Sequence, residues 1–64
     1  MPNQENERAV LSYYAREALE IEQPTPLGGL TVAAFRSTRE RLVQNGELVR
    51  SNGRYLPVAL AGRC

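Results

Sequence analysis

The 64-residue chain contains no histidine, aspartate or lysine, and its only cysteine is the last residue, Cys64. Metal sites and nucleophile-plus-base catalytic centres are built largely from these residue types, so both have almost nothing to be made from here. The length allows one domain, residues 1–64, near the lower size limit for a stable core, and leaves no room for a large catalytic cleft. We therefore expect no enzyme activity, catalytic residue, metal, cofactor or small-molecule substrate.

Long apolar stretches and paired cysteines are also missing. No segment approaches the roughly 18 consecutive apolar residues of a membrane span, and the polar start, Met1 to Arg8, is unlike a signal peptide. A single cysteine cannot form an internal disulfide, which fits a reducing cytosol, and we interpret Cys64 as a free thiol in the tail. We expect a cytoplasmic protein with no membrane partner.

The net charge of +1 hides an asymmetry between the two halves. Residues 1–30 hold two arginines against five glutamates, a net charge of −3, whereas residues 31–64 hold six arginines against two glutamates, a net charge of +4. A local cluster of positive charge is what phosphate binding needs. That every cation is arginine favours planar, bidentate contacts, although biased codon usage would produce the same composition.

Residues 32–45 are predicted to form a helix with both ends marked in the sequence. Thr31 follows two glycines and can cap the start, and Asn45-Gly46 supplies a left-handed stop. One side of this helix carries Val32, Phe35, Thr38, Leu42 and Val43. The other side carries Ala33, Arg36, Ser37, Glu40 and Gln44. This second side is small near its start and carries one long cation, which suits a helix that enters the DNA major groove; an ordinary solvated face is the alternative.

Two short strands, residues 47–50 and 54–58, are predicted to follow, joined by the turn formers Ser51, Asn52 and Gly53. An isolated hairpin is marginal in water. We therefore expect either that the hairpin packs on the helices through Leu48, Tyr55 and Val58 or that a partner extends the sheet. The residues after Val58 carry no clear signal, and Leu60 either docks or frays with them.

Residues 28 to 58 resemble the winged helix-turn-helix family, of the type that includes the bacterial GntR and MarR regulators. The pattern that carries the resemblance is Gly29-Leu30-Thr31, Phe35, Leu42, Gly46, Leu48-Val49-Arg50 and Gly53-Arg54-Tyr55. The resemblance implies a small α+β winged helix in which the helix after Thr31 reads a major groove and the hairpin tip contacts backbone or minor groove. The DNA-binding residues that it implies are Thr31, Ala33, Arg36, Ser37, Arg41, Arg50, Ser51, Asn52 and Arg54.

The segment 23–27 departs from that pattern, because its two prolines prevent the full second helix of the family. We expect at most one helical turn after Pro26, with Leu27 and Leu30 anchoring the loop on the core. The fold would then contain two main helices and a two-stranded hairpin.

A first helix is predicted from Asn3 to about Glu22, capped by Asn3 or Asn6. Its expected apolar stripe is Val10, Leu11, Tyr14, Ala18 and Ile21. Tyr13 falls outside this stripe, as an incidental exposed aromatic or as part of a subunit contact. Arg16 and Glu20 are spaced to pair along the exposed side.

Arg39 is the second departure, because it stands in the middle of the apolar face between Phe35 and Leu42. An unpaired buried charge there would be costly. Three interpretations remain open: a salt bridge with Glu17 or Glu20, a stem that leads the charge to water without a fixed partner, and a contact with a second subunit.

Two functions from different classes fit these patterns. The first is sequence-specific binding of double-stranded DNA by a dimer, as a regulator of transcription or of replication, phage or plasmid functions. The second is a small protein-interaction module built on the same scaffold. Arg36, Arg41, Arg50 and Arg54 favour the first, whereas Glu40 and the five glutamates of the first half favour the second, since carboxylates repel phosphate.

Overall fold

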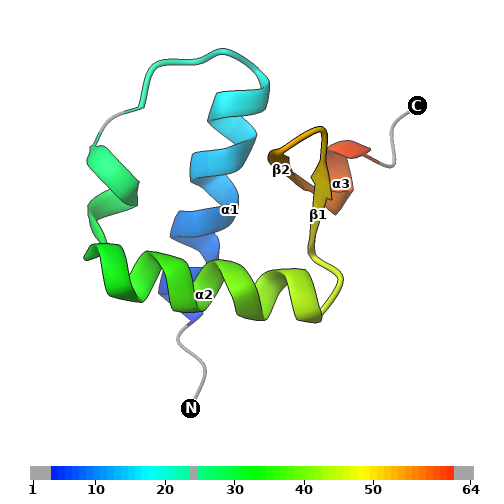
Figure 1. Ribbon diagram of the computed structural model, residues 1–64. Helices are drawn as coiled ribbons and strands as arrows, with labels where there is room; N and C mark the ends of the chain where they lie inside the picture. The colour runs from blue at the N-terminus through cyan, green and yellow to red at the C-terminus, as the bar shows by residue number, and fades with distance from the viewer. Residues whose placement is uncertain (1–3, 24, 62–64) are drawn as a thin grey trace.

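A computed structural model describes residues 4–23 and 25–61 of the chain (Figure 1). Its elements are α1 (Gln4–Ala18), the short 3₁₀ turn η1 (Pro26–Gly29), α2 (Val32–Gln44), β1 (Leu48–Ser51), β2 (Arg54–Pro57) and α3 (Val58–Ala61). Two main helices with one helical turn between them, followed by an antiparallel hairpin, confirm the predicted α+β fold and its winged-helix layout. The interpretations of Asn3 and Cys64 fall outside the described residues.

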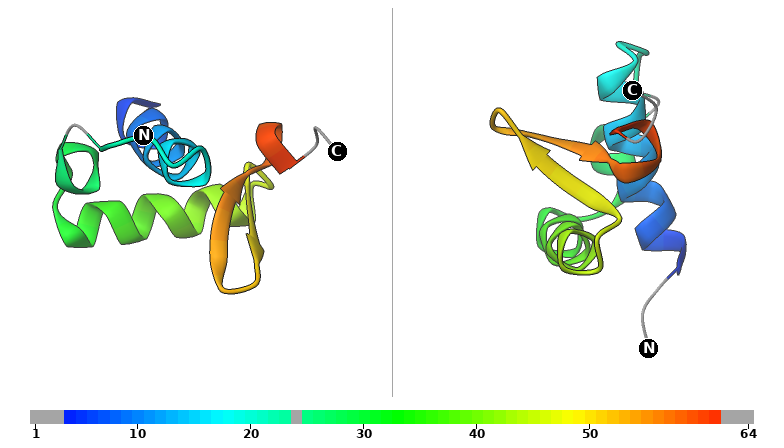
Figure 2. Two further views of the ribbon diagram at one scale, coloured as in Figure 1. Left: turned by 90° about the horizontal axis from the view of Figure 1, so that it is seen from above. Right: turned by 90° about the vertical axis from the view of Figure 1, so that its right-hand side faces the viewer.

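The core lies where α1, α2 and the base of the hairpin meet. Its buried side chains are Val10, Tyr14, Phe35, Leu42 and Leu48. Figure 2 shows that α2 and the hairpin tip both lie on one side of α1, with the tip projecting past α2. Among the described residues, no helix has the length and apolar character needed to cross a membrane.

Helix α1 ends at Ala18, earlier than the predicted Glu22. The amide of Ile21 donates to the Arg16 carbonyl at 2.9 Å, and the amide of Glu20 donates to the Glu17 carbonyl at 3.2 Å. With Glu20 at φ 59°, this is a Schellman stop, in which glycine usually holds the left-handed position. A glutamate there gives no local stop signal, which is why the prediction ran past the end.

The connection between the helices is tied back to α1. Gln23 Nε2 donates to the Tyr13 carbonyl at 2.7 Å, and Gly28 approaches Ala9 so closely that a Cβ on Gly28 would lie 3.2 Å from the Ala9 carbonyl oxygen. Leu27 and Leu30 are half-buried against the core. Both leucine anchors are therefore confirmed. A single turn follows Pro26, but it is not an ordinary right-handed helical turn, since φ is 53° at Leu27 and 64° at Gly28.

Both predicted ends of α2 are present. Thr31 Oγ1 accepts a hydrogen bond from the Ala34 amide at 3.1 Å, and Gly46 adopts φ 80° while the Glu47 amide donates to the Leu42 carbonyl at 2.9 Å. The helix ends at Gln44, one residue earlier than predicted, because Asn45 serves as its C-terminal cap.

The hairpin pairs Leu48 with Pro57 and Ser51 with Arg54, so its loop contains two residues, Asn52 and Gly53. Their φ values of 53° and 77° are those of the tight Asn-Gly turn that suits strand twist. Ser51 therefore belongs to β1 and not to the turn. Leu48 and Tyr55 pack on the core as predicted.

Several predicted apolar contacts are not formed. Val58 begins α3 and is 44% exposed, and on α2 Val32 and Val43 are 63% and 37% exposed. The inward row of α2 is instead centred on Phe35 and Leu42, with half-buried Thr38 and Arg39 on the same side. Ala18 is the last residue of α1 and Ile21 lies beyond its end, and both are exposed.

Tyr13 is not the exposed aromatic that was predicted. It is half-buried and packs against the core, with its ring edge-on to both Tyr14 and Phe35 at centroid distances of 5.2 and 5.0 Å. Val10, Tyr13 and Tyr14 stand at helical spacings of three and four, so the signal was present in the sequence. A subunit contact is not needed to explain this side chain.

Candidate nucleic-acid interface

The outward side of α2 is fully open to solvent. Because Phe35 and Leu42 turn the helix toward the core, the opposite row faces away from it. Its exposed side chains are Ala33, Arg36, Ser37, Glu40 and Gln44. The first turns carry small side chains, so another molecule can approach the backbone closely there, and Arg36 extends from the next turn.

The hairpin tip is equally exposed, at Arg50, Ser51, Asn52 and Arg54. The register Arg50↔Tyr55 and Ser51↔Arg54 places both arginines near the loop. Figure 2 shows this tip reaching beyond α2 on the side away from α1. The tip and α2 therefore lie on the same side of α1, with a hollow between them that Glu40 and Arg50 line.

The predicted DNA-binding residues all lie at the surface, but they are not equally close to one another. Arg36 and Arg41 are five positions apart and so lie about 140° apart around the helix. Arg36 lines a hollow toward α1, whereas Glu40 and Arg50 line another between α2 and the hairpin, of about 380 Å³. Arg41 stands on the other flank of α2.

Thr31 has a structural role at this surface. Its hydroxyl oxygen accepts from the Ala34 amide, so one lone pair is used in capping α2. The hydroxyl proton stays available for donation to a phosphate oxygen beside the helix start. The residue is exposed, which such a contact requires.

Behind the exposed face, Arg39 lies between two tyrosines. Its guanidinium carbon is 4.8 Å from the centre of the Tyr55 ring, a cation–π contact. A side-chain hydrogen bond to the Tyr14 hydroxyl raises the pKa of Arg39 above its ordinary value. Burial raises the pKa of Tyr14, and the Arg39 guanidinium opposes part of that rise.

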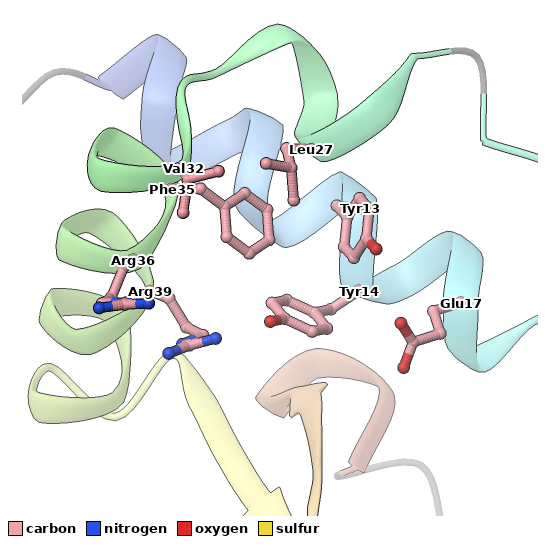
Figure 3. A pocket seen from close by; sticks show the side chains of 8 residues that line it. All are labelled: Tyr13, Tyr14, Glu17, Leu27, Val32, Phe35, Arg36 and Arg39. Carbon is pink, nitrogen blue, oxygen red and sulfur yellow. The ribbon is translucent and has the colours of Figure 1, made fainter.

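The carboxylate pairing predicted for Arg39 is not found among the described residues. Figure 3 shows Glu17 across the hollow from Arg39, with Tyr14 between them and its hydroxyl directed toward the arginines. This hollow measures about 320 Å³. Arg16, for its part, donates to the Glu22 carbonyl at 3.3 Å in place of the predicted pairing with Glu20.

The aromatic residues form a connected cluster that the sequence patterns did not reveal. Tyr14 lies 5.6 Å from Phe35 and 5.4 Å from Tyr55, measured between ring centres. Such tilted arrangements contribute about 0.5–1.5 kcal/mol beyond area burial. The cluster joins α1, α2 and β2, and so couples the hairpin to the helices.

Neither a protein-family model nor a curated protein nor a solved structure matches the chain. Within residues 4–23 and 25–61, acidic and cysteine side chains form no group that could hold a metal ion. The function is therefore inferred from the geometry and charge of the surface formed by α2 and the hairpin tip.

Proposed function

We propose that the protein binds double-stranded DNA sequence-specifically and acts as a regulator of transcription or replication. Helix α2 enters the major groove with its outward row, and the hairpin tip contacts the neighbouring backbone or minor groove. The observation that carries this proposal is that α2 and the tip project from the same side of the molecule with Arg36, Arg50 and Arg54 exposed on them.

The dimensions and chemistry of α2 suit this role. Its 13 residues span about 20 Å at 1.5 Å per residue, and a major groove is about 12 Å wide. Ala33 lets the helix start approach the bases, and Arg36 is long enough to reach a guanine edge with two donors. Arg41, Arg50 and Arg54 then neutralise phosphates around that contact.

A dimer completes the proposal. The molecule measures 32 × 26 × 19 Å, so one copy covers little more than a single half-site when the helical repeat is about 34 Å. One module of this size makes too few contacts for tight binding at ordinary salt. Two copies would read two half-sites.

A specific observation favours a protein partner as the second candidate. Exposed Val32 and Val43 lie on the same flank of α2, and Val43 lines the hollow beside the hairpin together with Glu40. Apolar side chains and a carboxylate suit a protein surface better than a phosphate backbone. Under this candidate the scaffold is the same, but DNA would not be retained.

The deciding experiment separates reading from anchoring. A preferred duplex is first selected from a pool with a randomised centre, and binding is then measured on it and on random duplex. Arg36→Ala is expected to cost about 1–3 kcal/mol on the preferred duplex and little on random DNA, whereas Arg54→Ala weakens both alike.

Arg8→Ala is the control, because Arg8 is an exposed cation on α1, outside the proposed surface. It is expected to bind both duplexes as the wild type does. Two outcomes would show that α2 does not read bases. Either selection enriches no sequence, or Arg36→Ala and Arg54→Ala each lose as much affinity for the random duplex as for the preferred one.

A further inference from the structure

The hairpin depends on contacts with the helices, because its own two strands are too short to be stable alone. Each strand has four residues, and a two-stranded hairpin of this kind is marginal alone. Leu48, 1% exposed, anchors its base in the core. The tip from Ser51 to Arg54 is exposed on every side chain, so its direction depends on contacts made by the middle of the strands.

Tyr55 supplies that middle contact. It stands next to Arg54 along β2 and opposite Arg50 across the hairpin. Its ring lies against the Tyr14 ring of α1 and under the Arg39 guanidinium of α2. The position of Tyr55 therefore determines where both tip arginines stand relative to the helices.

Arg39 joins all three parts of the fold. It belongs to α2, its guanidinium covers the Tyr55 ring of β2, and Figure 3 shows it facing the Tyr14 hydroxyl of α1 across the hollow that both side chains line. It also follows Arg36 by three positions on α2, and Figure 3 shows the two side chains leaving the helix next to each other. The cation that holds the hairpin is thus beside the cation proposed to read DNA.

The choice of arginine at this inward position carries a cost. Its Nε is buried and has no hydrogen-bond partner among the described residues, and an unmade hydrogen bond at a buried polar atom is destabilising. An aliphatic side chain would avoid that destabilisation, but it could neither donate to the Tyr14 hydroxyl nor make a cation–π contact with the Tyr55 ring. A planar guanidinium can donate to one aromatic residue while it stacks on another.

We propose that Arg39 is a positioning residue that holds the hairpin at a fixed angle to α2 and thereby sets the spacing between Arg36 and Arg54 on the DNA. This inference deepens the proposed function and depends on it for its DNA readout. Arg39 itself need not touch DNA; it acts through Tyr55.

The test compares Arg54→Ala in two backgrounds, wild type and Arg39→Met, below the melting temperature of each protein. In the wild type, Arg54→Ala is expected to weaken binding to random duplex about tenfold, as a lost phosphate contact does. In Arg39→Met the same change is expected to cost less than about twofold, because contacts that act together are not additive. The loss of affinity that Arg36→Ala causes on the selected duplex is expected to be the same in the wild-type and Arg39→Met backgrounds.

A purely stabilising role would not produce this pattern, since it would leave the effect of Arg54→Ala unchanged. Two further variants separate the ring from its hydroxyl: Tyr55→Phe keeps the ring and is expected to behave as wild type, whereas Tyr55→Leu is expected to behave as Arg39→Met. An equal loss from Arg54→Ala in both backgrounds overturns the inference.

Failure of the proposed function is recognised separately, because the wild type would then bind no duplex. In that case, hydrogen exchange on the DNA-free protein tests whether Arg39 positions the hairpin. Hairpin amides are expected to exchange several-fold faster in Arg39→Met than in the control Arg8→Met, while the central amides of α1 and α2 keep their protection. Equal hairpin exchange in the two variants overturns the inference.

Discussion

At the scale of single residues, Arg39 shows how a chain with few acidic side chains near its core accommodates a cation. Carboxylates are the usual partners of half-buried arginines, yet here a phenol and an aromatic face take that place. The same contact acts on Tyr14, a residue only 7% exposed, because the nearby guanidinium lowers the Tyr14 pKa against the larger rise that burial causes.

This arrangement predicts a late ionisation of Tyr14. Burial raises the pKa of Tyr14 above its ordinary value of 10.0, so an ultraviolet absorbance titration is expected to show a component above pH 10.0 that is lost in Tyr14→Phe. Because the raised pKa belongs to the folded state, the associated stability is present below pH about 10 and is lost as the pH rises through the folded pKa. Arg39→Met, which removes an opposing influence, is expected to raise the Tyr14 pKa further. A Tyr14 component that ionises at or below pH 10.0 and is unchanged by Arg39→Met would contradict this.

Glu20 offers a second prediction at this scale. Its φ of 59° places a side chain in the left-handed region that glycine adopts without strain. Glu20→Gly is expected to stabilise the fold by about 0.5–1 kcal/mol in a denaturant titration, after the entropy lost by glycine is subtracted. Glu22→Gly is the matched control, since Glu22 has no positive φ, and it is expected to give no gain. A gain from both variants would point to a general effect of lost negative charge.

At the scale of elements, the sequence predicted the helix ends and turns that are determined by neighbouring residues. Thr31 marks the start of α2, Asn45-Gly46 marks its end, and Asn52-Gly53 forms the hairpin loop, so these elements were placed within a residue or two. The end of α1 was missed because Glu20 carries no stop signal. The partners of Arg39 were missed because Tyr14 and Tyr55 are distant in sequence and meet only when the hairpin folds back.

The element η1 gives a prediction about how closely it packs on α1. A Cβ on Gly28 would meet Ala9 at 3.2 Å, whereas a Cβ on Gly29 would meet nothing within 4 Å. Both glycines have positive φ, 64° and 86°, so alanine is strained at either position. Gly28→Ala is expected to cost about 1 kcal/mol more than Gly29→Ala in thermal or denaturant unfolding, because overpacking adds to the strain. Equal losses would show that η1 does not press against α1.

At the scale of the whole molecule, the distribution of charge agrees with the arrangement of elements. The acidic residues 1–30 supply α1 and the connection, and the basic residues 31–64 supply α2 and the hairpin. The side formed by α2 and the hairpin tip is thus the basic one, which suits attraction to a polyanion. Composition predicted the asymmetry, but only the fold brings α2 and the hairpin tip to one side of α1. Arg50 and Arg54 extend from opposite faces of that tip.

The measurement that tests the DNA-binding function most directly is the dependence of affinity on salt. For the wild type on the selected duplex, the logarithm of affinity is expected to fall with the logarithm of salt by about 0.9 for each phosphate neutralised, a slope near −3 to −4 if Arg36, Arg41, Arg50 and Arg54 engage phosphates or bases. Replacing Arg41, Arg50 and Arg54 together by glutamine is expected to reduce the slope to about −1, whereas Arg8→Gln leaves it unchanged. A wild-type slope near zero, or no binding even at low salt, would contradict the proposed function and favour a protein partner.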